Sequence, residues 1–268
     1  MQTCKIDKII VGGNNPPRLM GVVNCSPESF FSGSYSTPER VYEQAARLIE
    51  EGAEIIDIGA RSTAPLSRPI SVAEEIERMK TALSGLSGSG IPVSVDTMYP
   101  EVLDMSIRYD VSCINDIHGL ANDEFAKTTG DSGLPAILMA SYKEPGDPVG
   151  FDSIRDALDV VLNRAKGRGI NEIVLDPAVG KWTTERTSED DWEICRRFDE
   201  LNATGYPLLA AVSRKTFIGE LVNAPPEGRL AGTLAVTYSL LESGASIVRA
   251  HDITETRNLI DVFGKLNY

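Results

Sequence analysis

Short apolar runs alternate along the chain with longer amphipathic stretches, and this alternation constrains the fold more than any other feature. The runs are rich in Val, Ile and Leu and do not alternate strictly with polar residues, which is typical of parallel strands covered on both faces. Stretches such as 41–51 and 154–166 repeat apolar residues with the helical period instead. The expected strands are 19–23, 54–58, 92–95, 113–114, 135–139, 172–175, 207–211 and 246–249.

Eight strand–helix units within 268 residues fit a closed barrel better than a doubly wound open sheet. The first strand is not followed by GxGxxG, so the main cue for a dinucleotide-binding fold is missing. No linker or low-complexity stretch divides the chain, and 86–90 reads as a flexible connector. We therefore predict an α/β protein with one (β/α)8 TIM-barrel domain over 1–268. The segment before Leu19 is expected to form a small lid over the barrel's bottom.

The charge and the cysteines narrow the classes of partner. A net charge of −13 argues against general nucleic-acid binding, although a local cluster of Arg and Lys can still hold a small anion. The four cysteines are scattered singly, so neither a disulfide framework nor zinc is expected. We expect no secretory signal, and no apolar window approaches the ~20 residues of a membrane span. The sequence predicts a cytoplasmic protein without a membrane or nucleic-acid partner.

Polar residues follow seven of the eight expected strands. In a TIM barrel the carboxyl ends of the strands meet at one mouth, where active sites are built. A single polar strand end is often structural, because it caps the next helix, but a near-complete ring at one mouth predicts a functional site. In chain order the strand ends carry Asn24, Asp57, Asp96, Asn115, Met139, Asp176, Ser213-Arg214-Lys215, and Arg249 with His251.

The composition of this ring indicates what it binds. Asp96, Asn115 and Asp176 offer acceptors and Lys215 offers a cation, which suits a flat heterocycle with an aminopyrimidinone edge. A second group, Arg249, His251 and the Ser62-Thr63 pair, suits an anion. The chain has only two histidines and neither HxH nor HExxH, so a histidine-rich metal site is not expected.

Seven motifs in register then resemble the dihydropteroate synthase family and span nearly the whole chain. Residues 19–31 (LMGVVNCSPESFF) resemble the family's opening motif, and residues 54–65 (EIIDIGARSTAP) resemble its second signature. The others are SVDT at 94–97, IND at 114–116, LDPAVG at 175–180, SRKTFIG at 213–219 and VRAHD at 248–252.

The resemblance implies a pterin-binding domain and a transferase. In this family 4-aminobenzoate displaces diphosphate from 6-hydroxymethyl-7,8-dihydropterin diphosphate, with Mg²⁺ as cofactor, and members are commonly homodimers. The loops 26–35 and 61–69 would close over the site. By position, Asn24 would ligate Mg²⁺; Asp96, Asn115, Met139, Asp176 and Lys215 would hold the pterin; Thr63, Arg249 and His251 would bind the diphosphate; Ser213 and Lys215 would border the arylamine; and Asp96 and Lys215 would serve catalysis.

The chain departs from the family pattern in the second signature and after Gly180, and also at 139–141 (MAS), which lacks the family's histidine. Arg61 stands where the second signature has Glu, and Ala64 stands where it has Arg. Arg61 either replaces the lost diphosphate contact or is a surface arginine on a loop. After Gly180, Lys181 and Trp182 replace the family's usual Phe and Lys, which places Lys181 on the arylamine side.

The added positive charges favour an amine larger and more anionic than 4-aminobenzoate. With the SPESF variant of the opening motif, they indicate an archaeal-type branch whose amine is a ribosylated aminobenzene phosphate, as in methanopterin synthesis. Two alternatives stay open: a pterin-dependent methyltransferase acting on a corrinoid, and an inactive pterin-binding homologue. Asp57 is equally a ligand contact or a support for a neighbouring loop.

Overall fold

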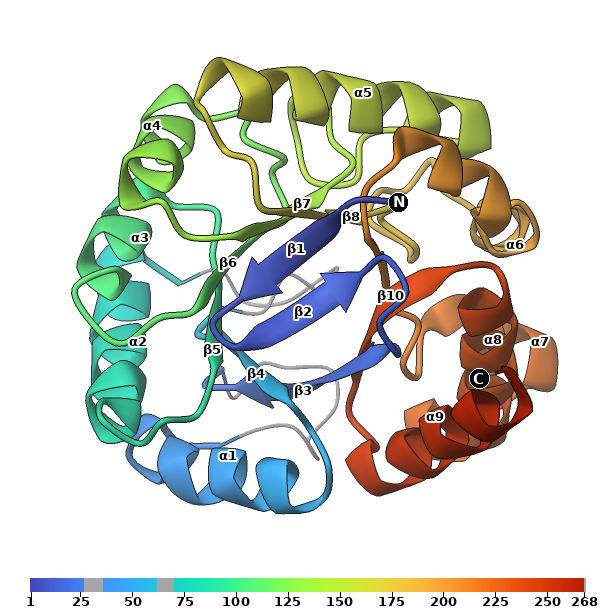
Figure 1. Ribbon diagram of the computed structural model, residues 1–268, viewed down its shortest axis with the longest axis horizontal. Coiled ribbons are helices and arrows are strands. Elements are labelled where there is room, and N and C mark those ends of the chain that lie inside the picture. Colours follow the sequence, from blue (N-terminus) through green and yellow to red (C-terminus); the bar gives the residue numbers. More distant parts are fainter. Residues whose placement is uncertain (27–35, 62–69, 268) are drawn as a thin grey trace.

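A closed barrel of eight parallel strands forms the centre of the molecule, as the computed structural model shows for residues 1–26, 36–61 and 70–267 (Figure 1). Every strand of the barrel falls on one of the predicted apolar runs, so the predicted TIM barrel is confirmed. Going round the barrel, the strands are β10 (Ala245–Ala250), β3 (Arg18–Asn24), β4 (Ile55–Gly59), β5 (Val93–Asp96), β6 (Cys113–Asp116), β7 (Ala136–Met139), β8 (Ile173–Asp176) and β9 (Leu208–Ala210).

Helices cover the outside of the barrel (Figure 1). None of those in the described ranges combines the length and the apolar character needed to cross a membrane. They are α1 (Val41–Glu50), α2 (Val72–Leu86), α3 (Pro100–Ser106), α4 (Asp123–Ser132), α5 (Phe151–Gly167), α6 (Ser188–Arg196), α7 (Thr216–Val222), α8 (Leu230–Glu242) and α9 (Ile253–Asn267), with 3-10 turns η2 (Pro38–Arg40), η3 (Phe198–Thr204) and η4 (Pro226–Gly228).

Local sequence explains where several helices begin and end. The Ser71 side chain accepts a hydrogen bond from the Glu74 backbone N–H at 3.1 Å and so caps the start of α2. Helix α4 was not predicted, because its sequence is short and mostly polar. The helix is capped at its carboxyl end by Gly133, which has the left-handed conformation.

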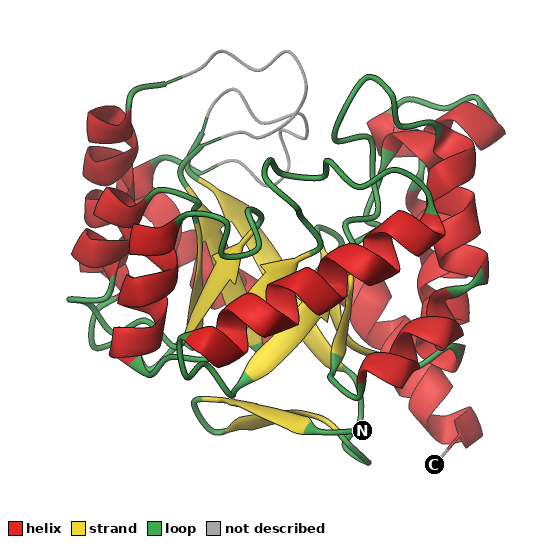
Figure 2. Cartoon of the chain, turned by 90° about the horizontal axis from the view of Figure 1, so that it is seen from above, coloured by secondary structure: helices red, strands yellow, loops and turns green. Residues whose placement is uncertain are grey.

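A hairpin closes the amino end of the barrel (Figure 2). Its strands β1 (Thr3–Ile6) and β2 (Ile9–Gly12) pair antiparallel, and Cys4, Ile6 and Val11 are fully buried. They form one apolar cluster with residues near the starts of the barrel strands, including Met20 and Ile55. The expected lid over the barrel's bottom is therefore present.

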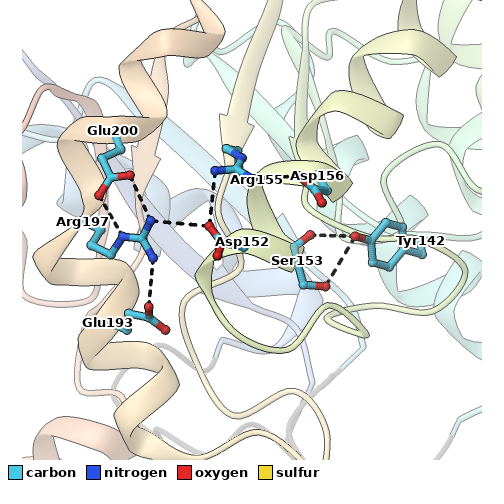
Figure 3. Close-up of polar contacts among 8 residues, drawn as sticks. All are labelled: Tyr142, Asp152, Ser153, Arg155, Asp156, Glu193, Arg197 and Glu200. Atoms are coloured by element: carbon cyan, nitrogen blue, oxygen red, sulfur yellow. Dashed lines mark hydrogen bonds and ion pairs between the residues drawn. The ribbon is translucent and has the colours of Figure 1, made fainter.

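On the outside, an ionic network joins α5 to the α6–η3 segment (Figure 3). Arg197 donates to Glu193 at 3.0 Å and to Glu200 at 2.8 Å, and it lies 3.5 Å from Asp152 at the start of α5. Nearby, the Tyr142 hydroxyl donates to the Ser153 carbonyl at 2.9 Å. The hydrogen bond between Tyr142 and Ser153 ties the loop after β7, which borders the mouth of the barrel, to α5.

The buried hairpin yields a stability prediction. Ile6→Ala should lower the free energy of unfolding by about 2–5 kcal/mol, because the removed side chain leaves a cavity between the hairpin and the barrel. The matched control is Ile10→Ala on the same hairpin, where the side chain is 42% exposed and the expected loss is about 0.5 kcal/mol or less. Urea unfolding measures both, and equal losses would contradict a hairpin whose apolar face is buried against the barrel.

Candidate active site

A single buried carboxylate organises the strand ends on one side of the barrel mouth. Asp57 Oδ2 accepts hydrogen bonds from Asn115 Nδ2 at 3.0 Å and from Arg249 Nε at 2.7 Å. Arg249 also reaches Asp96 Oδ2 through Nη2 at 3.2 Å. Asp57 is completely buried, and its Oδ1 has no hydrogen-bond partner in the described part of the chain. Asp57 therefore supports Asn115 and Arg249 from below.

The strand register explains this convergence. Gly59 of β4 lies opposite both Asn24 of β3 and Asp96 of β5, and Asp96 lies opposite Asn115 of β6. Successive parallel strands thus carry their polar ends to the same level of the barrel. Asn115 is almost buried, whereas Asp96 and Arg249 are partly exposed towards the mouth.

Gly59 keeps a small space open between two oxygens. A Cβ at this position would lie 3.6 Å from Asn24 Oδ1 and 3.7 Å from Asp96 Oδ2. Amide and carboxylate oxygens are hard ligands of the kind that Mg²⁺ prefers, with phosphate and water oxygens completing its shell. Within the described ranges, no cluster of three or more His, Cys, Asp or Glu side chains forms a self-sufficient metal centre. The donor set fits an ion shared with a phosphorylated ligand.

Lys215 and Asp176 face each other on the opposite side of the mouth. Burial lowers the pKa of Lys215 to about 8, assisted by the positive charges of Arg249 and Arg186 and opposed by Asp176 and Asp191. Burial raises the pKa of Asp176, and Lys215 opposes that rise. The Lys215 ammonium donates to the Val179 carbonyl and lies 5.7 Å from the centre of the Trp182 ring.

The two residues on either side of Arg214 reach the mouth because Arg214 itself turns away. Its backbone is left-handed, with φ of +56°, and its guanidinium binds both oxygens of Asp252, at 2.9 and 2.6 Å. Arg214 is therefore a buried brace between the loop after β9 and the loop after β10. The brace holds Ser213 and Lys215 next to Arg249 and His251.

His251 is held in a defined orientation and is neutral. Its Nδ1 lies 2.9 Å from Ser213 Oγ, and its backbone N–H donates to the same oxygen at 3.2 Å. Burial first, and then the positive charges of Arg249, Arg214 and Lys215, lower the pKa of His251 to about 3. At neutral pH the imidazole can therefore give an anion a hydrogen bond but no positive charge.

Arg61 is tied to the protein and is not a surface arginine, so that alternative is wrong. Its Nε donates to Glu75 Oε2 at 2.6 Å, and its side chain is 14% exposed. The guanidinium also lies over the Tyr99 ring, 4.7 Å from its centre. Glu75 is buried and accepts a second hydrogen bond from Thr97 at 2.8 Å. Much of the charge that Arg61 adds to the chain is thus neutralised internally.

Three other expected site residues do not lie at the mouth as predicted or cannot be compared with the prediction. Met139 is 1% exposed and belongs to the apolar core, so it offers almost no surface to a ligand. Lys181 is exposed on the loop after β8. Thr63 lies outside the described residues.

Several residues that shape the mouth were not among the site residues predicted from the sequence. Gly59 and Asp252 lie inside the matched motifs, so their positions carried a signal. Arg186 and Asp191 lie outside every motif and had none, because their pairing depends on the fold of the loop before α6.

The electrostatics of Asp96 yield a pH prediction. Burial first, and then the Asp57 charge, raise the pKa of Asp96 from its ordinary 3.8 to about 7, against the opposing effect of Arg249. Ionising Asp96 therefore costs the folded state stability above pH 7, and this cost is relieved as the pH falls from 7 towards 4. In metal-free buffer, the melting temperature of Asp96→Asn minus that of the wild type should be a few degrees more positive at pH 8 than at pH 5. A difference that stays constant over this range would contradict the raised pKa.

Comparisons with known proteins agree with this site. The family model described as "Pterin binding enzyme" matches residues 20–251. The chain is 33% identical over 243 residues to the dihydropteroate synthase of Bacillus subtilis, covering 88% of this chain and 84% of that protein. It is 31% identical to that of Escherichia coli K12, covering 90% and 88%.

Solved structures give the same answer. The dihydropteroate synthase of Coxiella burnetii, in complex with pteroic acid, aligns with a TM-score of 0.87 at 27% identity over 98% of both chains. That of Xanthomonas albilineans, with 4-aminobenzoic acid, aligns with a TM-score of 0.87 at 30% identity over 98% of this chain and 97% of that one. The relatives thus favour a synthase over the methyltransferase alternative. The chain belongs to the pterin-binding enzyme family, as a transferase homologous to dihydropteroate synthase.

Proposed function

We propose that the protein joins 6-hydroxymethyl-7,8-dihydropterin diphosphate to 4-aminobenzoate and releases diphosphate. The observation that carries the proposal is the charge layout of the mouth. Asp96, Asn115, Asp176 and Lys215 form a set suited to a polar heterocycle, and Arg249 with the neutral His251 forms an adjoining set suited to an anion. A pterin diphosphate carries both groups on one molecule.

The pterin would lie between the two sides of the mouth. The Asp96 and Asp176 carboxyl groups would accept hydrogen bonds from the ring N–H groups, while Lys215 and Asn115 would donate to its acceptors. Burial raises the pKa of both Asp96 and Asp176. Hydrogen bonds from the ring N–H groups would favour the charged forms of these carboxyl groups, which are the stronger acceptors. Met139 would support this pocket from the core.

The diphosphate would lie at Asn24, Arg249 and His251, with Thr63 and Arg61 as further expected contacts. Asn24 Oδ1 would hold Mg²⁺ in the space beside Gly59, and the bound ion would neutralise negative charge on the leaving diphosphate. Asp57 fixes Arg249 Nε, so that the remaining guanidinium face is already oriented for the leaving group. His251 would contribute one N–H.

In the reaction, the amine nitrogen bonds to the exocyclic carbon of the pterin while the bond from that carbon to the diphosphate oxygen breaks. The chain would act by positioning and electrostatics, and no covalent bond to the enzyme is required. Asp96 would stabilise the positive charge that develops at the carbon, and Lys215 would hold the ring in line. We treat these two as the catalytic residues.

The amine would bind beside Ser213, Lys181 and Trp182. Two added positive charges argued for a larger, more anionic amine, but Arg61 is paired with Glu75, so Lys181 carries the argument alone. This favours 4-aminobenzoate and folate synthesis. The ribosylated aminobenzene phosphate of an archaeal-type, methanopterin-forming branch is the second candidate. Bacterial relatives and a probable bifunctional folylpolyglutamate synthase/dihydropteroate synthase of Haloferax volcanii share similar identity with the chain, 30–33% for the former and 32% for the latter.

Turnover tests the proposal directly. Diphosphate release from the pterin diphosphate is measured with each amine, in the presence of Mg²⁺ and again with EDTA. We expect release with 4-aminobenzoate that EDTA abolishes and Mg²⁺ restores. Lys215→Ala should lower kcat/KM by about 100-fold or more, since it removes a fixed cation from the site. The control is Lys166→Ala, on the outer face of α5. Pterin binding without release from either amine would identify an inactive homologue instead.

We further propose a homodimer, which uses the α7–α9 side of the barrel. Leu221 and Val222 of α7 and Val262 and Leu266 of α9 are exposed large apolar residues, at 69%, 48%, 58% and 67%. Val262 and Leu266 lie one turn apart on one face of α9, and α8 packs between the same helices (Figure 1). Exposed large apolar residues on neighbouring helices are typical of protein interfaces.

Light scattering after size-exclusion chromatography tests the dimer. The wild type should elute with twice the mass of one chain, and the double variant V262E/L266E should elute as a monomer, because charge is introduced into an apolar interface. Val149→Glu, at a 41% exposed position before α5, should remain dimeric. A monomeric wild type would rule the dimer out.

The cellular setting is also part of the proposal. All four cysteines are buried and unbridged. This agrees with the reducing conditions of the cytoplasm.

A further inference from the structure

Arg186 is a buried cation that the proposed chemistry does not use. It lies in the loop between β8 and α6, it is 1% exposed, and it is one of the largest fully buried side chains in the described chain. Its Nε donates a hydrogen bond to Asp191 Oδ1 at 3.1 Å and its Nη2 lies 3.0 Å from the same oxygen, but neither Nη1 nor Nη2 has a hydrogen-bond partner among the described residues. Removing two charges from water is costly, and a buried ion pair of this kind contributes little net stability.

The Arg186–Asp191 pair is coupled to the loop that carries Gly180. The same oxygen of Asp191 that meets Arg186 accepts the Gly180 backbone N–H at 2.7 Å. The carbonyl oxygen of the preceding residue, Val179, accepts a hydrogen bond from the Lys215 ammonium. A continuous chain of polar contacts therefore runs from Arg186 through Asp191 and the 179–180 backbone to Lys215.

Gly180 makes the close approach to Lys215 possible. Its φ is +128°, and a Cβ at this position would lie 3.1 Å from both Cδ and Nζ of Lys215. A side chain at position 180 would crowd the lysine, so the close approach of the loop depends on glycine at this position. The Gly180 N–H, held by Asp191, is the contact that fixes this conformation from the outer side.

We propose that Arg186 and Asp191 are a positioning pair that holds the 179–180 backbone against Lys215 and so aims its ammonium into the mouth. This inference rests on the proposed function, in which Lys215 contacts the pterin. Arg186 and Asp191 act through Lys215 and touch no substrate themselves.

The charges around Lys215 give this pair a distinctive signature. Lys215 faces Asp176 at the end of β8, Asp191 on α6, Arg249 on β10, Arg186 on the loop, and the Trp182 ring. The pKa of Lys215 is lowered to about 8, mainly by burial, and among the charges that contribute to this value Asp191 raises the pKa and Arg186 lowers it. Removing one partner or the other should therefore move the lysine pKa in opposite directions.

The test measures kcat and KM of the full chain between pH 6 and 10, with Mg²⁺, the pterin diphosphate and 4-aminobenzoate. The charged lysine is the active form, so activity should fall as the pH rises through its pKa. Asp191→Asn should move this alkaline limb to lower pH and Arg186→Gln should move it to higher pH. Each should lower kcat by roughly 100-fold, because the ammonium is no longer held in place. Arg186→Lys, which keeps the charge, should leave the limb near its wild-type position.

Controls on the same helix separate this role from general damage to α6. Glu189→Gln and Arg196→Gln break an exposed ion pair two and five residues from Asp191, and both should behave as the wild type. If Arg186→Gln does not fold, Gly180→Ala replaces it. That variant leaves the ion pair intact, places a methyl group against Lys215, and should lower kcat as strongly.

Some outcomes would overturn the positioning role. They are an alkaline limb that stays fixed, a limb that moves the same way in both charge variants, or full activity in Gly180→Ala. A wild type without turnover contradicts the proposed function instead. In that case the pH dependence of 6-hydroxymethylpterin binding is measured by fluorescence quenching in the wild type and the variants. The failure of the positioning role and the failure of the proposed function therefore remain distinguishable.

Discussion

The contact between Asp57 and Arg249 is the interaction on which the mouth of the barrel depends. One carboxylate, buried at the level where the strands end, binds the side chains of two neighbouring elements, Asn115 and Arg249. Arg249 in turn reaches Asp96. Without the buried carboxylate, a guanidinium would lie at the mouth without its closest counter-charge, and the amide would lose its orientation. The arrangement of the pterin side and of the anion side therefore shares one support.

The same design recurs on the other side of the mouth. Arg214 braces Asp252, and Asp191 braces Gly180. In each case a buried charged pair fixes backbone next to a residue that faces the mouth. The side chains that face the ligand are few, and the buried pairs beneath them set their directions. Preorganised charges of this kind do not need to reorganise while the reaction proceeds.

The sequence allowed the barrel to be predicted because a strand covered on both faces must be apolar, and each of the eight apolar runs became a strand. The position of the polar strand ends at one mouth could also be predicted, because the carboxyl ends of all strands of a TIM barrel meet at the same face. Helix α4 was missed because it buries few residues and its composition resembles a loop. The partner of Arg61 could not be predicted, because Glu75 lies on another element and only packing brings the two together. Arg186 and Asp191 were missed for the same reason.

The hairpin at the amino end of the barrel has a consequence for the opposite end. By filling the interior with Cys4, Ile6 and Val11, it keeps water out of the space below the charged ring. The charges at the mouth are therefore screened by solvent from one side only. A substrate that displaces this remaining water completes a low-dielectric enclosure, so that each ionic contact in the site strengthens at the moment of binding. The hairpin thus lowers the dielectric constant around the site by excluding water from below, although it contributes no residue to the site.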